Sequence, residues 1–281
     1  MFEGESMSKK IIVAAFFMLA LIICYRVEQN IYESKTYSFY KNVGNQLTEE
    51  ESEAVDSQEI LEQEVIQENL MVEEKKKVAY LTFDDGPSTL TPDILKTLKE
   101  KQVNATFFLI GNQINEETIP ILKQSIADGN CIGIHTYCHE CKVIYQDADA
   151  YIKDFDEAFC TIKDKLGIEP TIFRFPWGSA NGFLSNIEDE IIDTLEARGF
   201  TYYDWNVSAE DSVGNPTSYS IMKNIRKDYK KYNKPIILMH DSSVNKLTAK
   251  MLPQIIDELK QAGYSFDTLD HMEDPYQYPR D

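Results

Sequence analysis

From Val78 onward, short apolar runs alternate with longer amphipathic stretches. The apolar runs have the length and side-chain types of strands and cover residues 78–84, 105–110, 131–135, 171–175, 201–207, 235–240 and 264–269. Between most of them, helical spacing recurs in residues 92–102, 116–129, 148–167, 185–199, 217–232 and 248–263. Gly129, Gly167 and Gly199 end their helices, and each is followed shortly by a predicted strand. Strand–helix alternation repeated about seven times predicts a parallel α/β barrel or a doubly wound sheet in one domain.

The first residues follow another pattern. Lys9 and Lys10 precede an uncharged apolar run, residues 11–25, and Arg26 follows it. We expect residues 1–26 to form an uncleaved signal anchor whose positive N-terminal flank places the rest of the chain outside the cytoplasm. At about 1.5 Å per residue the run is short for a ~30 Å hydrocarbon core, and a cleaved signal peptide or a lipid on Cys24 are the alternatives.

Residues 27–75 are polar and acidic, with at most a short helical stripe of apolar residues. This composition predicts a charge-extended stalk without chemistry of its own. The chain therefore divides into an anchor or signal (1–26), a stalk (27–75) and one folded domain (76–281).

Charge limits the choice of partner. The chain has 28 Lys+Arg against 47 Asp+Glu, a formal net charge of −19. Nucleic acid and anionic lipid surfaces would be repelled, so neither is expected as the main partner. A neutral or basic substrate fits this balance better.

Polar residues interrupt the predicted strands near their carboxyl ends: Asp84, Asp85, His135, Arg174, Asp204 and His240. Active sites assemble at that edge in parallel α/β folds. His135 and His139 lie at positions i and i+4, and on a helical turn their rings would converge on one ion. Adjacent carboxylates at a strand end point to different sides, so one of Asp84 and Asp85 can bind metal while the other acts as a base.

Five polar-rich segments occur in this order along the chain: TFDDGP (82–87), HTYCH (135–139), RFPWG (174–178), YDWNVSAED (203–211) and ILMHDS (237–242). Together they resemble the motifs of the polysaccharide deacetylase family, also called the NodB homology or carbohydrate esterase family 4 domain. The resemblance covers about residues 76–272, and the order of all five motifs makes it specific. It implies a distorted (β/α)7 barrel of the NodB type for the catalytic domain.

The resemblance also implies roles for individual residues. It implies a metal site formed by Asp85, His135 and His139. The implied catalytic residues are the base Asp84, its orienting partner Arg174, the general acid His240 and the partner of that histidine, Asp211. The implied substrate-binding residues are Pro176, Trp177 and Trp205 in the groove, with a Trp177 backbone N–H at the oxyanion, and Leu238 at the acetyl methyl group.

Two histidines and one carboxylate leave open positions on a divalent ion, which acidifies a bound water and polarises an acetamide carbonyl. Zinc is the expected metal, and cobalt, nickel or iron also suit this ligand set. We therefore expect a metal-dependent hydrolase, monomeric in its catalytic domain, that removes N-acetyl groups from a cell-wall or extracellular glycan such as peptidoglycan. The alternatives are an O-acetyl esterase acting on xylan and a catalytically silent glycan-binding protein of the same fold.

Four positions depart from the family pattern: Cys131, Ile134, Cys138 and Glu210. None of them removes an implied ligand or proton carrier, but they could alter the surroundings of the metal. Beyond the anchor the cysteines are Cys131, Cys138, Cys141 and Cys160, an even number that allows three disulfide pairings or free structural thiols.

Overall fold

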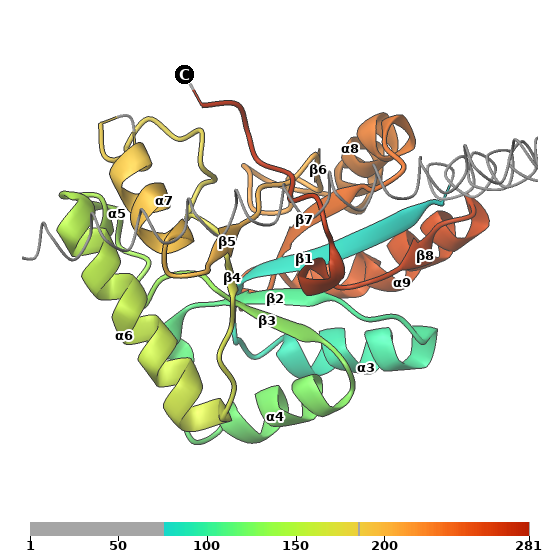
Figure 1. The fold of residues 1–281 in the computed structure, drawn as a ribbon. Coiled ribbons are helices and arrows are strands. Elements are labelled where there is room, and N and C mark those ends of the chain that lie inside the picture. Colours follow the sequence, from blue (N-terminus) through green and yellow to red (C-terminus); the bar gives the residue numbers. More distant parts are fainter. Residues whose placement is uncertain (1–75, 185, 281) are drawn as a thin grey trace, which may run out of the picture. The chain divides into compact units, whose positions relative to one another are not determined.

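The computed structural model describes residues 76–184 and 186–280, which form a parallel sheet surrounded by helices (Figure 1). Its strands are β1 (Val78–Gly86), β2 (Thr106–Leu109), β3 (Cys131–Ile134), β4 (Ile172–Phe173), β5 (Thr201–Tyr202), β6 (Val207–Ser208), β7 (Ile236–His240) and β8 (Ser265–Phe266). They are ordered β5–β4–β3–β2–β1–β7–β6, with β8 paired to β1. Every pairing is parallel, which confirms the predicted parallel α/β architecture.

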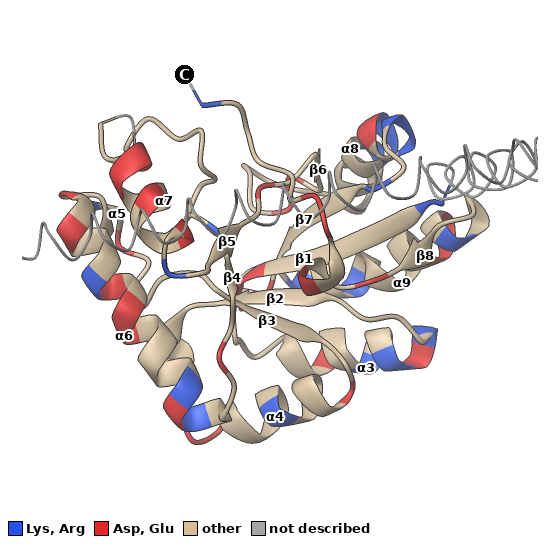
Figure 2. Cartoon of the chain, viewed as in Figure 1, with Lys and Arg blue, Asp and Glu red and all other residues tan. Residues whose placement is uncertain are grey.

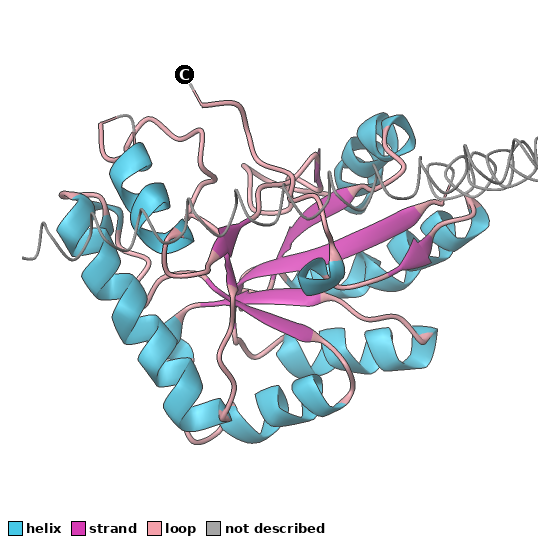
Figure 3. Cartoon of the chain, in the orientation of Figure 1, coloured by secondary structure: helices cyan, strands magenta, loops and turns pink. Residues whose placement is uncertain are grey.

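The helices cover the outside of the sheet (Figure 3). They are α3 (Thr91–Lys101), α4 (Ile119–Ala127), α5 (Cys141–Ile144), α6 (Ala148–Leu166), α7 (Glu188–Glu196), α8 (Ser218–Asp228) and α9 (Lys246–Gln261), with 3-10 turns at Gly111–Gln113, Tyr229–Lys231 and Leu269–His271. The six helices expected from the sequence are all present. Helix α5 was not expected, because one turn is too short to show a period. Gly129, Gly167 and Gly199 have φ values of 91°, 78° and 88°, as expected beyond helix ends.

The expectation of one strand over residues 201–207 was wrong. The chain forms β5, leaves the sheet at Tyr203–Asn206, and enters β6 at the other end of the strand order. The backbone N–H of Asp204 bonds to Tyr276 O (2.9 Å), in the C-terminal segment, instead of to a neighbouring strand. β5 and β6 are therefore the two unpaired ends of the sheet, and residues 203–206 connect them.

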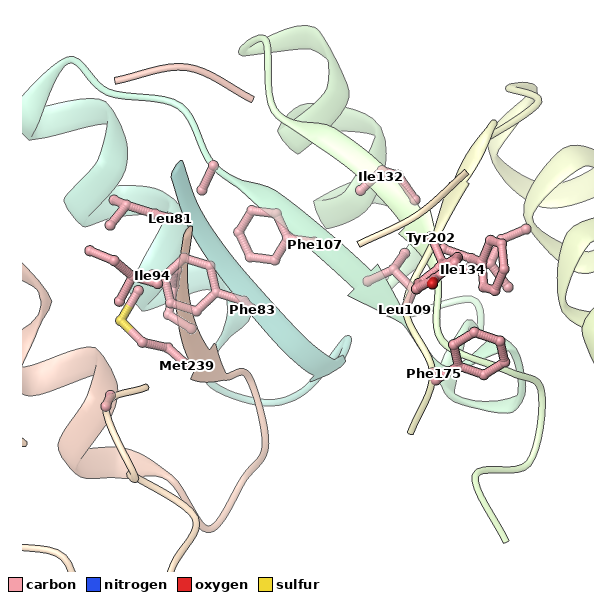
Figure 4. Packing of buried hydrophobic residues seen from close by; sticks show 14 of the residues in the cluster. Leu81, Phe83, Ile94, Phe107, Leu109, Ile132, Ile134, Phe175, Tyr202 and Met239 are labelled. Atoms are coloured by element: carbon pink, nitrogen blue, oxygen red, sulfur yellow. The ribbon is translucent and has the colours of Figure 1, made fainter. Parts of the chain in front are cut away.

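The two faces of β1 have different surroundings. Ala79, Leu81 and Phe83 belong to the large apolar cluster that the helices cover. Figure 4 shows Leu81 and Phe83 packed with Ile94 of α3, Phe107 of β2 and Met239 of β7. The alternate residues of β1 face the barrel interior, beginning with Val78 and Tyr80. Because side chains alternate along a strand, Thr82 and Asp84 continue this inward row.

Charged residues fall mainly in the helices and loops, and the strands carry few of them (Figure 2). Within residues 76–184 and 186–280, no helix combines the length and apolar character that a membrane crossing needs. The predicted anchor (1–26) and stalk (27–75) lie outside the described residues.

Candidate active site

The candidate catalytic and metal-binding side chains meet at the carboxyl edge of the sheet. Asp84 and Asp85 end β1, His135 follows β3, Arg174 follows β4 and His240 ends β7. These strands are neighbours or near neighbours in the sheet, so residues distant in sequence converge as expected for a parallel fold.

Arg174 fills the interior of the barrel beneath Asp84. Its side chain is fully buried and stacks 4.3 Å from the ring centroid of Phe108. Its Nη1 donates to Asp84 Oδ1 at 2.9 Å and to Thr82 Oγ1 at 2.7 Å. Its other nitrogens donate to the backbone carbonyls of Tyr203 (2.9 Å) and Asp204 (3.1 Å). The guanidinium thus fixes one oxygen of Asp84 and compensates its buried charge, while Asp84 Oδ2 remains directed at the site.

Asp85, His135 and His139 form a cluster in which one ligand atom from each lies within 4.8 Å of the others. Asp85 Oδ1 is 3.6 Å from His135 Nε2 and 3.3 Å from His139 Nε2. His135 Nδ1 lies 2.8 Å from the Arg174 carbonyl. Since a carbonyl only accepts, Nδ1 carries the proton and Nε2 offers its lone pair to the cluster. Burial and the neighbouring His135 lower the pKa of His139 to about 4, against the opposing effect of Asp85, so the His139 ring is neutral near pH 7.

The expected helical turn between the two histidines was wrong. The segment is an irregular loop in which Thr136 and His139 have φ values of 65° and 55°, and Asp85 opposite has 69°. Such left-handed backbone is uncommon outside glycine and collects at functional sites. The rings converge because the loop bends, and not because they are one helical turn apart.

A buried carboxylate from α6 holds this loop. Asp154 is 8% exposed and accepts the backbone N–H of Tyr137 (2.5 Å) and that of Cys138 (3.1 Å). Both amides belong to the chain between His135 and His139. Asp154 therefore fixes the loop from behind. The sequence analysis did not predict that Asp154 holds this loop. An aspartate on the apolar side of a helix, between Tyr151 and Phe155, is the feature that could have indicated it.

His240 is held by Asp211 at the opposite side of the site. Its Nδ1 donates to Asp211 Oδ1 at 2.8 Å, and its backbone N–H donates to Asp211 Oδ2 at 2.9 Å. Thr248 Oγ1 also donates to Asp211 Oδ2, at 2.5 Å. Burial of the imidazole lowers its pKa, but the hydrogen bond and charge of Asp211, with the charges of Asp84 and Asp85, outweigh this and raise the pKa of His240 to about 9. The ring is therefore protonated at neutral pH.

Asp241, directly after His240, is fully buried and holds the turn that follows β1. It accepts from Ser88 Oγ and Thr91 Oγ1, each at 2.6 Å, and its N–H donates to Asp84 O at 2.7 Å. A Cβ on Gly86 would lie 2.7 Å from Asp241 Oδ2, so the close packing requires glycine there. Sequence reasoning missed Asp241 because it carries no chemistry itself, although its place beside His240 was a signal.

Asp204 joins the RFPWG segment to the C-terminal segment. Its carboxylate accepts from Ser179 N (2.9 Å), Ser179 Oγ (2.6 Å) and Tyr278 N (2.9 Å). Tyr278 packs edge-on against Trp205, with ring centroids 5.5 Å apart. Gly178 approaches Trp205 so closely that a Cβ would lie 2.8 Å from its ring. The predicted groove residues of the two motifs are thus held together by one buried carboxylate.

The remaining predicted substrate residues lie around the same site. The Trp177 ring is 49% exposed and lies 4.8 Å from the His139 ring, and Pro176 precedes it with its carbonyl bonded to Tyr145 Oη (2.8 Å). Leu238 pairs in register with Thr82 and lies on the inward row of β7, two residues before His240.

The departures from the family pattern leave the site intact. Ile134 is fully buried in the helix-covered cluster, and Glu210 turns its carboxylate to Asn224 Nδ2 (3.0 Å) on α8. The four cysteines of the described part are free thiols, so no disulfide pairing is formed among them. Cys131 lies at the opposite end of β3 from His135, where burial raises the pKa of its thiol.

Comparison with known proteins agrees with this geometry. The family model described as polysaccharide deacetylase matches residues 71–202. A peptidoglycan-N-acetylglucosamine deacetylase of Bacillus cereus is 32% identical over 198 residues, which cover 69% of this chain and 69% of that protein. A bifunctional xylanase/deacetylase of Pseudobutyrivibrio xylanivorans is 33% identical over 199 residues, 71% of this chain and 31% of that protein.

Among solved structures, the catalytic domain of a peptidoglycan N-acetylglucosamine deacetylase from Eubacterium rectale superposes with a TM-score of 0.66 at 29% identity. The match covers 73% of this chain and 93% of that domain, and it confirms the predicted NodB-type barrel. The chain belongs to the polysaccharide deacetylase family.

Proposed function

We propose that this protein hydrolyses N-acetyl groups of a cell-wall or extracellular glycan, with N-acetylglucosamine in peptidoglycan or a related polymer as the substrate, and releases acetate. The proposal rests mainly on one observation: a candidate proton acceptor and a candidate proton donor lie around the cluster of candidate metal ligands. Asp84 is a carboxylate fixed by Arg174, and His240 is an imidazolium fixed by Asp211. The peptidoglycan deacetylases among the relatives support the amide as the bond cleaved.

The residues present fit a divalent metal ion. Asp85, His135 and His139 offer one carboxylate oxygen and two Nε2 lone pairs within 4.8 Å of one another, and the Arg174 carbonyl fixes the tautomer of His135. When bound there, a divalent ion supplies Lewis-acid polarisation of a carbonyl and lowers the pKa of a coordinated water. We propose zinc on the basis of this ligand set, with cobalt, nickel or iron as the other metals that it suits.

The chain's own residues divide the proton transfers. Asp84 Oδ2, 3.9 Å from His135 Nε2, accepts the proton of the attacking water, while Arg174 keeps Asp84 Oδ1 occupied. His240 Nε2 is left for the substrate, because Nδ1 is bonded to Asp211, and it donates a proton to the departing amine nitrogen. The protonated His240 ring also stabilises the negative charge that develops on the carbonyl oxygen. Acetate and a free amino sugar result.

We propose that the acetyl methyl group contacts Leu238, while Pro176 and Trp177 on one side and Trp205 on the other line the groove. Leu238 and His240 lie on the same inward row of β7, which puts an apolar contact beside the proton donor. Trp177 lies against His139, and Trp205 lies 5.7 Å from the Arg174 guanidinium. We propose that a backbone N–H at Trp177 also donates a hydrogen bond to the carbonyl oxygen of the acetyl group.

A second candidate is hydrolysis of acetyl esters on xylan, which the bifunctional xylanase/deacetylase relative favours. Asp84 and His240 could serve in the same roles for an ester. Because an alkoxide leaves more readily than an amine, ester hydrolysis would depend less on proton donation by His240. A catalytically silent glycan-binding role is disfavoured, because every implied ligand and proton carrier is present and in contact with its partner.

We further propose that residues 1–26 anchor the protein in the cell membrane, and that residues 27–75 carry a monomeric catalytic domain outside the cytoplasm. The basic flank and apolar run support this topology. Protease treatment of intact cells tests it: a domain outside the cytoplasm is digested without lysis, whereas protection until lysis contradicts it.

The activity is tested with the purified full chain and added zinc or cobalt. Acetate release is measured from peptidoglycan, chitin oligomers and acetylated xylan. The proposal expects the highest kcat/KM on an N-acetylated glycan. Faster release from xylan favours the ester candidate, and no release from any of them favours the silent glycan-binding protein.

A further inference from the structure

Three aromatic side chains continue from the metal cluster out to the molecular surface. We call Tyr145, Trp177 and Phe183 the aromatic rim. Trp177 lies 4.8 Å from the His139 ring, and Phe183 lies 6.1 Å from Trp177 at an interplanar angle of 61°. Tyr145 lies beneath both, 6.1 Å from Trp177 and 6.2 Å from Phe183, and is nearly parallel to the latter. Phe183 is therefore two ring contacts away from a metal ligand.

The rim is a built surface. Tyr145 Oη donates to the Pro176 carbonyl at 2.8 Å, which ties the residue after α5 to the RFPWG segment. Asn181 Nδ2 donates to the carbonyls of Pro176 (3.2 Å) and Gly178 (2.6 Å), and Asn181 Oδ1 accepts from Phe183 N at 2.9 Å. The backbone of Phe183 is thus held by Asn181, which is itself bonded to the RFPWG segment.

Folding does not require Phe183 to be aromatic. Its ring is 59% exposed, whereas the next residue, Leu184, is fully buried and anchors the segment in the core. A single exposed aromatic is ordinary, and Tyr219 on α8 is one: it is 75% exposed and has no aromatic ring contact among the described residues. Phe183 differs because it extends an exposed patch that begins at the site.

We propose that Phe183 forms a stacking subsite for the sugar residue next to the one that is deacetylated. The proposal rests on the proposed function, since it takes the reacting sugar to lie over the metal cluster. A pyranose ring has an apolar face of C–H groups that packs on an aromatic ring, and its hydroxyl groups remain in water at the exposed edge. Trp177 borders the reacting sugar, so the ring beyond it meets the next sugar along the polymer. The rim thereby selects a chain over a single acetylated sugar.

The test compares chain lengths with a matched control. Acetate release is measured for a peptide-free hexamer of β-1,4-linked N-acetylglucosamine and for the monosaccharide N-acetylglucosamine, with the full chain and its variants Phe183→Ala, Phe183→Tyr and Tyr219→Ala. Phe183→Ala is expected to raise KM for the hexamer roughly tenfold, equivalent to about 1.4 kcal/mol, and to lower the preference for the hexamer over the monosaccharide by a similar factor. Phe183→Tyr keeps the ring and the preference, and Tyr219→Ala matches the parent chain.

A binding measurement separates this proposal from the proposed function. Trp177 and Trp205 are the only two tryptophans in the chain, so their fluorescence reports hexamer binding without turnover. Weaker hexamer binding in Phe183→Ala supports the subsite even if the parent chain releases no acetate. Equal hexamer binding in Phe183→Ala and the parent overturns it, as does an equal loss for the hexamer and the monosaccharide. An effect seen only with peptide-bearing peptidoglycan fragments also overturns it, because the occupant is then the peptide.

Discussion

Asp84 and His240 are direct partners in the pairing of β1 with β7, and both end rows of side chains that point into the barrel. One is bonded to Arg174 and the other to Asp211. Two adjacent strands therefore present a carboxyl group and an imidazole at the same level of the sheet, with the Asp85–His135–His139 cluster beside them.

Replacing Asp84 by Asn removes the proton acceptor but keeps a side chain of the same shape. We expect kcat to fall by roughly 10² to 10⁴-fold while the chain still binds one zinc ion, measured by elemental analysis after dialysis. His139→Ala should instead lose the metal. Substantial activity in Asp84→Asn, or full zinc occupancy in His139→Ala, contradicts the assigned roles.

We expect Asp211 to set the upper pH limit of activity. In the proposed mechanism His240 acts in its protonated form, so kcat/KM should be maintained at lower pH and fall as the pH rises through about 9, the pKa of His240. Asp211→Asn removes the charge that raises this pKa, and the alkaline limb of the profile should move to lower pH. The exposed pair Asp267–His271, 2.8 Å apart, provides the control: Asp267→Asn leaves the profile in place. An unmoved limb in Asp211→Asn excludes His240 as the titrating acid.

The same pKa difference links His240 to folding. A histidine whose pKa is raised in the folded protein contributes stability that is complete below its unfolded value of about 6.5 and disappears as the pH rises through the folded value. For His240 the loss should fall between pH about 6.5 and about 9. Urea unfolding across this range, compared with His240→Gln, should show a smaller pH dependence in the variant.

Asp154 should matter for metal affinity although it touches no ligand atom of the cluster. Asp154→Asn keeps one acceptor oxygen and loses the second, so one of the amides of Tyr137 and Cys138 loses its partner. We expect zinc affinity to fall by roughly 10 to 100-fold, as for other residues that orient ligands. Competition with a chromogenic chelator measures it. Asp164→Asn, at an exposed position of the same helix, is the control, and equal affinities in the two variants contradict the role of Asp154.

Asp204 should contribute mainly to stability. Its carboxylate accepts three hydrogen bonds in a fully buried position, so Asp204→Ala leaves Ser179 and Tyr278 donors without a partner. The free energy of unfolding should drop by about 1–3 kcal/mol, measured by urea denaturation of the metal-loaded chain. Asp274→Asn, at an exposed position before the same C-terminal segment, should cause no such loss. A value for Asp204→Ala equal to that control contradicts the role.

The sequence predicts where the candidate site residues lie, but it does not predict the residues that hold them in place. Asp84, His135 and His240 are polar residues at the ends of apolar strands, and that pattern alone locates the edge of the sheet. The loop between His135 and His139 was not predictable from spacing, because its bend depends on Asp154, which comes from a helix later in the chain. The break at Asp204 was hidden because Tyr203 and Trp205 have strand-like side chains, while the partner of the Asp204 backbone lies in the C-terminal segment. Contacts between segments that are far apart in the sequence leave no periodic pattern in either segment, so these features could not be predicted.

Metal-dependent acetate release tests the central claim most directly. The full chain is treated with a chelator, assayed on peptidoglycan and chitin oligomers, and assayed again after zinc is restored. We predict that chelation abolishes acetate release, that zinc restores it, and that zinc does not restore it in His139→Ala. Release that persists in the chelated chain, or no release with any of zinc, cobalt, nickel and iron, would contradict the account.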